Sequence, residues 1–156
     1  MTLKVYPFLK GFLSQWHPAR LIIDGIEYNC AEQYMMHQKA ILFGDDKMAR
    51  KILANDKPHE QKLMGQYVKR FISDVWDLHK NEIVTKGNYA KFSQNAGLRK
   101  KLLATGDMIL AEANPKDIIW GIGLAEDDPD VQDQEKWRGP NNLGEILMKV
   151  RDQLSV

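Results

Sequence analysis

The stretch that decides both the fold and the site of this chain is Asn29-Cys30-Ala31-Glu32-Gln33-Tyr34-Met35-Met36-His37-Gln38-Lys39-Ala40. At 3.6 residues per turn it predicts a helix whose core-facing stripe holds Ala31, Tyr34, Met35, Ile41 and Leu42. Gln38 falls within that stripe, and the neighbouring stripe holds Glu32, Met36, Lys39 and Phe43. Polar and ionisable groups on a face that should be apolar indicate the active site.

Lys39 and Glu32 are the candidate catalytic residues. Met36 precedes Lys39 by three residues and Phe43 follows it by four, which predicts that the lysine is partly desolvated. Glu32 and Lys39 are seven residues apart, so they project in nearly the same direction with roughly 10.5 Å between their backbone positions. They can therefore face one pocket without direct contact.

Each of these residues also has a structural interpretation. Asn29 can be the N-cap of the helix, with Glu32 as its N3 partner in a variant of the capping box. Lys39 can be an interfacial lysine whose stem covers neighbouring methionines while its ammonium reaches water. Gln38 can be a hydrogen-bonded core amide. Their coincidence on one helix favours the functional interpretation.

Composition predicts one soluble, cytoplasmic domain over residues 1–156. The 22 Lys and Arg residues and the 21 Asp and Glu residues give a net charge of +1, which argues against tight duplex binding. The single cysteine, Cys30, excludes an internal disulfide, fits a reducing compartment and is expected to be a small buried side chain. We expect no signal peptide and no membrane span.

Local signals predict an α+β fold, mostly helical, around a small β-sheet. Asp24-Gly25 between two apolar triplets predicts a β-hairpin, residues 21–28. The hairpin leads into the first helix, which we expect to end at Gly44, and a second helix is expected from Asp45. A third is expected from Pro58 through Leu63, Val68 and Phe71. Two more are expected, one from a Ser73 cap over Trp76, Leu78, Ile83, Tyr89 and Phe92, and one from an Asn95 cap toward Gly106.

The C-terminal third predicts a buried strand over residues 108–111 and a last helix with Leu143, Ile146, Leu147, Val150 and Leu154 on one side. Between them, Asp117 and Trp120 flank an apolar run that leads into Gly121, where a ligand can approach the backbone; a buried strand with a turn is the alternative. Trp137 lies in a polar loop and can stack on a planar base or ring. Asn141 and Asn142 can cap the last helix.

Several chemistries lack their motifs in this sequence. His17, His37, His59 and His79 are scattered, without His-Glu-x-x-His or Cys-x-x-Cys spacing, so we expect no metal site. The chain also has no Gly-x-Gly-x-x-Gly and no Walker-type loop. We therefore expect no cofactor.

Taken together, the segments resemble the NADAR family of YbiA-like N-glycosidases. The matching pieces are Gly11-Phe12-Leu13-Ser14 with Trp16 and Pro18, Ala31 to Tyr34, Gln38-Lys39, Asp117 with Trp120 to Gly123, Trp137 to Gly139 with Asn141, Leu143-Gly144, Leu147-Met148 and Arg151. Their order covers residues from about 8 to 153. Gln15 departs from the asparagine that the family often has, which affects expected substrate contacts more than the fold.

The resemblance implies hydrolysis of the C1–N bond between a ribose and a base, with Lys39 as nucleophile. Attack by a neutral amine at C1 expels the base, and ring opening gives a Schiff base that water hydrolyses. Glu32 would protonate the base or activate water. The expected substrate-binding residues are Phe12, Ser14, Trp16, Gln38, Asp117, Trp120, Gly121, Trp137 and Asn141.

Three functions follow as hypotheses. The first is removal of ADP-ribose from ADP-ribosylated guanine in DNA or a nucleotide, for which the resemblance implies ADP-ribosylated DNA and a cognate ADP-ribosyltransferase toxin as partners. The second is cleavage of phosphoribosylamino-pyrimidine intermediates of riboflavin biosynthesis. The third is an ADP-ribose or NAD-binding module without catalysis, in which Lys39 contacts phosphate. The sequence leaves open whether Lys39 reacts covalently or water attacks directly with Glu32 as base.

Overall fold

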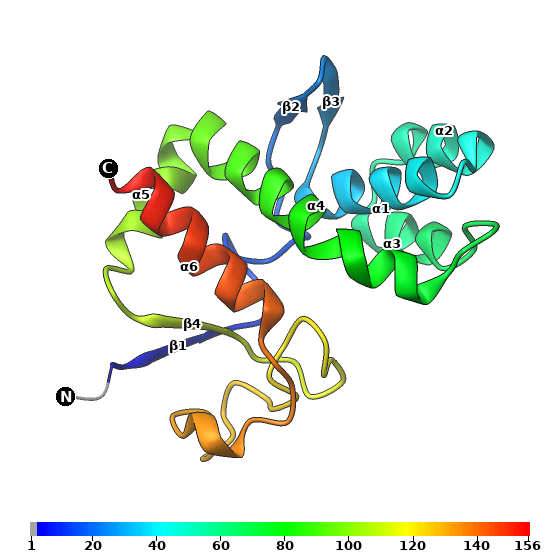
Figure 1. The fold of residues 1–156 in the computed structure, drawn as a ribbon. Coiled ribbons are helices and arrows are strands. Elements are labelled where there is room, and N and C mark those ends of the chain that lie inside the picture. Colours follow the sequence, from blue (N-terminus) through cyan, green and yellow to red (C-terminus); the bar gives the residue numbers. More distant parts are fainter. Residues whose placement is uncertain (1–2) are drawn as a thin grey trace. The chain divides into compact units, whose positions relative to one another are not determined.

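The computed structural model describes residues 3–156 as α-helices with two short two-stranded sheets (Figure 1). The predicted α+β class with helices in the majority is confirmed, although the strands form two sheets and not one. Packing divides the chain into two compact units. Residues 15–95 form the central unit, and the chain up to Ser14 forms the terminal unit together with residues 96–156.

The central unit begins with the predicted hairpin. Strands β2 (Leu21–Ile23) and β3 (Ile26–Tyr28) pair antiparallel, with Leu21 opposite Tyr28. Asp24 and Gly25 connect them with φ values of 52° and 79°. Two successive positive φ values give the turn the same twist as the strands, and Asp-Gly adopts them readily. This prediction is confirmed.

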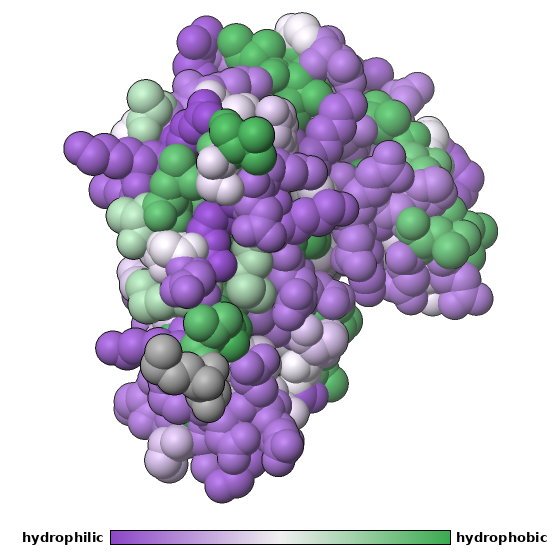
Figure 2. Space-filling model, turned by 60° about the vertical axis from the view of Figure 1, so that its left-hand side comes forward, coloured by the Kyte–Doolittle hydropathy of each residue, from purple (hydrophilic) through white to green (hydrophobic). Residues whose placement is uncertain are grey.

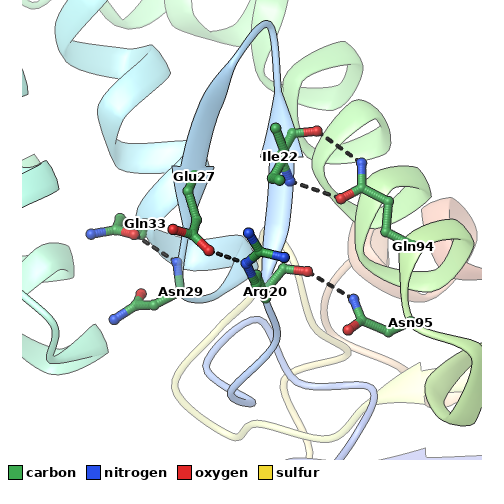
Figure 3. A network of polar contacts seen from close by, with 7 residues as sticks. All are labelled: Arg20, Ile22, Glu27, Asn29, Gln33, Gln94 and Asn95. Carbon is green, nitrogen blue, oxygen red and sulfur yellow. Dashed lines mark hydrogen bonds and ion pairs between the residues drawn. The ribbon is translucent and has the colours of Figure 1, made fainter.

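A glutamine side chain closes the outer edge of each sheet. Figure 3 shows Gln94 accepting from the Ile22 N–H and donating to the Ile22 carbonyl, both at 2.8 Å. Gln132 does the same for Val5, at 3.1 Å for each bond. A carboxamide carries the donor and acceptor of a peptide group, so it satisfies a strand edge that would otherwise be open to pairing. Asn95 adds a bond to the Arg20 carbonyl at 2.9 Å.

Four helices complete the central unit: α1 (Ala31–Leu42), α2 (Asp46–Ala54), α3 (Pro58–Gly65) and α4 (Ser73–Gln94). The predicted cap of α2 is confirmed, because the Asp45 carboxylate accepts from the Met48 N–H at 3.1 Å. It also accepts from the Lys69 N–H at 2.9 Å, and these bonds lower the pKa of Asp45. One carboxylate thus fixes the start of α2 and the loop that precedes α4.

Two predictions about helices α3 and α4 are wrong. Helix α3 ends at Gly65 and does not continue to Phe71. Helix α4 is capped at Ile72 and not by the Ser73 side chain. Asn95 donates to the carbonyls of Arg20 and Lys91 and so ties α4 to the hairpin. Asn95 also directly precedes α5 (Ala96–Ala104), which is where the sequence places the start of that helix.

Some apolar residues of the helices are exposed against expectation: Ile41, Leu63, Leu78 and Tyr89. Leu78 is 81% exposed. The buried face of α4 is set by Gly87, because the Tyr34 ring of α1 lies where a Cβ would stand, 2.8 Å from its Cδ2. Trp76, Val84 and Phe92 are buried together with Gly87, whereas Leu78 and Tyr89 lie outside the buried face.

The terminal unit pairs β1 (Val5–Phe8) with β4 (Ile109–Glu112) in parallel, with Val5 opposite Ile109. Strand β4 confirms the predicted strand within one residue, whereas β1 was not predicted. Helices α5 (Ala96–Ala104) and α6 (Asn142–Leu154) belong to the same unit, and α6 packs on β4. The predicted apolar side of α6 is confirmed, since all five of its residues are buried.

The surface is mostly hydrophilic. On the face drawn in Figure 2, hydrophobic residues occur in separate groups among hydrophilic ones. None of the helices between residues 3 and 156 has the length and apolar character that crossing a membrane requires.

Candidate functional site

The start of α1 is held by a cap that differs from the predicted one. Cys30 is the N-cap, and its Sγ accepts from the Gln33 N–H at 3.4 Å. The Gln33 Oε1 accepts from the Asn29 N–H at 2.8 Å, which completes a reciprocal cap. The capping-box interpretation of Asn29 with Glu32 is therefore wrong, because Gln33 takes that position. Cys30 is buried as predicted.

Glu32 is buried in the first turn of α1, with 6% of its surface exposed. Its backbone N–H donates to the Gln15 carbonyl at 3.0 Å, which joins the segment before the hairpin to the helix. Its negative charge raises the pKa of Lys39 and of Cys30. The Glu32 carboxylate therefore acts electrostatically on the amine of Lys39 at the other end of α1.

Lys39 lies in an aromatic environment in the last turn of α1. Its Nζ is 4.6 Å from the centre of the Phe71 ring and 5.7 Å from that of Trp76. Burial lowers the pKa of Lys39 and outweighs the opposite effect of Glu32. The predicted partial desolvation is confirmed. Its main cause was not predicted, because Phe71 and Trp76 lie more than thirty residues further along the chain.

Gln38 behaves as a hydrogen-bonded amide beside a buried pair of rings. The Tyr28 hydroxyl and His37 Nδ1 are 2.9 Å apart, and the Gln38 Nε2 is 3.4 Å from the same nitrogen. Burial lowers the pKa of His37, so the neutral ring can accept at Nδ1 from the hydroxyl. Burial also raises the pKa of Tyr28. These contacts agree with the structural interpretation of Gln38 as a hydrogen-bonded amide.

Sequence reasoning missed Lys91, a fully buried lysine on α4. Its side chain is 0% exposed, and burial lowers its pKa to about 7. Cys30 is near enough that the two groups influence each other's pKa, and burial raises that of the thiol to about 11. Helical spacing could have identified it, because residues three and four apart share one face of a helix. Gly87 and Asn88 precede Lys91 by four and three residues, and all three are buried.

We expect Lys91 to make stability depend on pH. The native side chain releases its proton near pH 7, whereas the unfolded one keeps it to about pH 10.5. Between pH 7 and 9 the unfolded state binds more protons, so the free energy of unfolding should rise, by roughly 1–2 kcal/mol. Urea unfolding across this range measures it. The Lys91→Met variant should flatten the profile, and an equal rise in that variant would contradict the assignment.

In the terminal unit, Asp117 organises a turn. Its Oδ1 accepts from the N–H groups of Ile119 and Trp120, at 2.9 and 2.8 Å. The segment is neither strand nor buried run, since Ile118 is 60% and Ile119 49% exposed. Gly121 is buried, and a Cβ there would lie 2.8 Å from the Glu112 carbonyl oxygen. The glycine thus serves close backbone packing within this unit.

Asn141 and Trp137 have structural roles that were not expected. The Asn141 side chain accepts from the Glu112 N–H at 3.0 Å and donates to the Leu110 carbonyl at 2.8 Å, so it pairs with β4 and not with the helix end. The loop that carries Trp137 folds back, and its Nε1 donates to the Val131 carbonyl at 2.8 Å. Its ring packs on a buried cluster formed by Val5, Ala111, Ala113, Ile122, Leu124 and Val131. Cap formation by the Asn141 side chain is therefore wrong, and stacking of Trp137 on a planar base or ring stays a prediction.

The predicted site residues are divided between the units. Glu32, Gln38, Lys39 and Trp16 belong to the central unit, and Trp16 is 41% exposed. The terminal unit contains Phe12, Ser14, Asp117, Trp120, Gly121, Trp137 and Asn141. Phe12 and Ser14 are half-buried in the segment after β1, where the Ser14 N–H donates to the Gly11 carbonyl. Substrate binding by these residues stays a prediction.

The central unit also has an open hollow of about 610 Å³ beside the hairpin. Its lining includes Arg20, Glu27, Asn29, Gln33 and Asn95, and excludes both Lys39 and Glu32. Figure 3 shows these polar groups bonded to one another, with Arg20 paired to Glu27 and Gln33 to Asn29. The hollow is therefore built from contacts that hold the hairpin in place. Among residues 3–156, no cluster of three His, Cys, Asp or Glu side chains forms a metal site.

Comparison with known proteins identifies the class. The NADAR domain matches residues 6–155. N-glycosidase R617 of Acanthamoeba polyphaga mimivirus is 46% identical over 145 residues, which cover 90% of this chain and 85% of that protein. A riboflavin biosynthesis protein of Vibrio vulnificus is 33% identical over 145 residues, 92% of this chain and 35% of the relative. The NMR structure of Escherichia coli YbiA matches 99% of this chain and 87% of its own, with a TM-score of 0.81 and 29% identity.

The chain belongs to the NADAR family. Its fold is that of YbiA, as the resemblance implied. The family match extends across both compact units.

Proposed function

We propose that this protein removes ADP-ribose from ADP-ribosylated guanine by hydrolysing the C1–N bond of the ribose, with Lys39 as the nucleophile. As a member of a family whose curated relatives are named N-glycosidases, it is a hydrolase acting on N-glycosyl bonds. The observation that carries the role of Lys39 is its half-buried amine against Phe71 and Trp76.

The aromatic environment bears on the reactivity of the amine. For a lysine with an ordinary pKa, being neutral at pH 7 costs roughly 4.6 kcal/mol, which is too much for an efficient nucleophile. Burial lowers the pKa of Lys39 and removes part of this cost. Lys39 is not fully buried. Burial also lowers the pKa of Lys91, but that lysine is fully buried, so Lys39 is the better candidate.

The reaction follows from these groups. The lone pair of the neutral Lys39 amine attacks C1 of the ribose, and the C1–N bond breaks with its electrons going to the base. The Glu32 carboxyl gives a proton to the departing base. Opening of the sugar ring yields a lysine Schiff base, to which water adds with Glu32 now accepting a proton. Breaking of the lysine–carbon bond then releases ADP-ribose and regenerates the amine.

The substrate is tested directly by incubating the protein with ADP-ribosylated guanine, as nucleoside and within an oligonucleotide, and following the release of ADP-ribose. A phosphoribosylamino-pyrimidine serves as the second substrate, because the Vibrio vulnificus relative is named a riboflavin biosynthesis protein. We expect release of ADP-ribose, with the guanine left in its nucleoside or oligonucleotide. Cleavage of the pyrimidine compound alone would show that the protein is an N-glycosidase with a different substrate from the one proposed. Ligand binding without any cleavage would indicate the non-catalytic binding module.

The covalent step is tested by adding borohydride during turnover and locating the adduct by mass spectrometry. We expect a reduced adduct on Lys39. An adduct on Lys91 would move the nucleophile to that residue. Turnover without any adduct would indicate direct attack by water with Glu32 as base.

The Glu32→Gln variant should lose about 100-fold or more of kcat at pH 7. The Glu32 charge raises the pKa of Lys39, so its removal makes the lysine more often neutral. Activity should nevertheless fall, because the variant has no acid to protonate the base. The exposed Glu82→Gln variant on the same unit is the control. Unchanged or increased kcat in Glu32→Gln would contradict the proton-donor role.

A further inference from the structure

Trp16, His59 and Lys62 form a cluster on the surface of the central unit. The Trp16 and His59 ring centres are 6.4 Å apart with an interplanar angle of 82°, so the histidine meets the indole edge-on. The Lys62 Nζ is 6.0 Å from the Trp16 ring. His59 and Lys62 are three residues apart on α3 and share one face of it. We call these three residues the Trp16 cluster.

The cluster is exposed although it contains a large aromatic residue. Trp16 is 41% exposed, and both His59 and Lys62 are exposed. A distance of 6.0 Å is the outer limit for attraction between a cation and an aromatic ring, so Lys62 contributes little to holding the indole. One exposed aromatic residue is ordinary. Proteins that bind single-stranded nucleic acid combine aromatic rings, on which bases stack, with positive charge along the backbone. The Trp16 cluster offers an exposed indole beside a lysine and a histidine.

The backbone places this cluster beside Glu32. The Glu32 N–H donates to the carbonyl of Gln15, the residue before Trp16. Helix α3 is fixed to the same end of α1, because the Cys30 thiol donates to Gln61 Oε1 at 3.2 Å and the Gln61 Nε2 donates to Asn29 at 3.1 Å. His59 and Lys62 flank Gln61 in the sequence. The cluster therefore borders the first turn of α1.

We propose that the Trp16 cluster is a subsite for a nucleoside 5′-phosphate, with the base stacked on the Trp16 indole and the phosphate bound by Lys62 and His59. This inference rests on the proposed function, because it places a nucleotide part of the substrate next to Glu32. Every base has a flat face that stacks on an aromatic ring, and a lysine ammonium is a suitable partner for phosphate. The same chemistry occurs in the adenylate half of ADP-ribose and in a neighbouring nucleotide of a nucleic-acid strand.

The test measures binding separately from turnover. Titrations use AMP, ADP-ribose and an eight-residue oligodeoxyadenylate, with wild type and the variants Trp16→Ala, Trp16→Phe and Lys62→Gln. Trp16→Ala should weaken binding by about 5-fold or more, while Trp16→Phe should retain most of it. Lys62→Gln should weaken binding and reduce its dependence on salt. The exposed Lys51→Gln variant is the matched control.

The ligand that loses affinity identifies the source of the nucleotide. Weaker AMP and ADP-ribose binding would assign the cluster to the adenylate, whereas a loss for the oligonucleotide alone would assign it to a neighbouring nucleotide. Equal affinity of wild type and all variants for all three ligands would overturn the subsite. In turnover assays the variants should show a raised KM and an unchanged kcat. If the proposed function itself is wrong, wild type will show no turnover either, so the two failures can be told apart.

Discussion

Replacing Lys39 with arginine should abolish turnover while ligand binding persists. Arginine keeps the positive charge and can still lie against Phe71 and Trp76, but it stays protonated and cannot form an imine. We expect kcat to fall by at least about three orders of magnitude, as for loss of a nucleophile. Base release under single-turnover conditions measures the fall, and a binding titration with ADP-ribose measures what remains.

The control for this experiment is Lys51→Arg, at an exposed position in the last turn of α2. It should retain wild-type kcat, because its side chain lies outside the proposed site. Full activity of Lys39→Arg would exclude covalent catalysis by Lys39. Loss of both binding and thermal stability would show instead that Lys39 is needed for packing.

The second large effect concerns Gly144, in the first turn of α6. A Cβ at this position would stand 2.1 Å from the Leu110 carbonyl oxygen and 2.3 Å from the Asn141 Nδ2. Backbone of β4 cannot yield as a flexible side chain can, so Gly144→Ala should separate α6 from β4 and break the bonds of Asn141 to that strand. We expect a loss of about 3 kcal/mol or more in the free energy of unfolding.

Gly97→Ala is the matched control for this prediction. Gly97 lies in α5, and nothing comes within 4 Å of a Cβ added there. Alanine is the better helix former, so this variant should be more stable by about 0.5–1 kcal/mol. Urea unfolding of both variants provides the comparison. Equal stability of Gly144→Ala and wild type would show that α6 can move away from β4 without cost.

Local signals predicted those parts of the fold that a few neighbouring residues determine. Asp24-Gly25 specifies its turn through positive φ, and Asp45 caps α2 because a carboxylate three residues before an N–H can accept from it. The apolar side of α6 was also predicted, since its period matches a helix that packs along one side.

Predictions failed where a distant residue takes up a local group. The Asn141 amide pairs with β4 instead of the helix end. The same reason explains Leu78, because the packing of Tyr34 against Gly87 sets which side of α4 is buried. The cap at Asn29 failed for a local reason, because Gln33 and not Glu32 completes it.

By itself the sequence identified the residues that we propose as catalytic: a lysine and a glutamate seven positions apart on one helix, within an ordered set of family motifs. Only the tertiary structure decided what surrounds them. Phe71 comes to Lys39 from the loop before α4 and Trp76 from the first turn of α4. Helix α3 brings His59 and Lys62 to Trp16. The physical reason is that helical spacing fixes the direction of a side chain on its own element, whereas desolvation and pKa depend on every element packed around it.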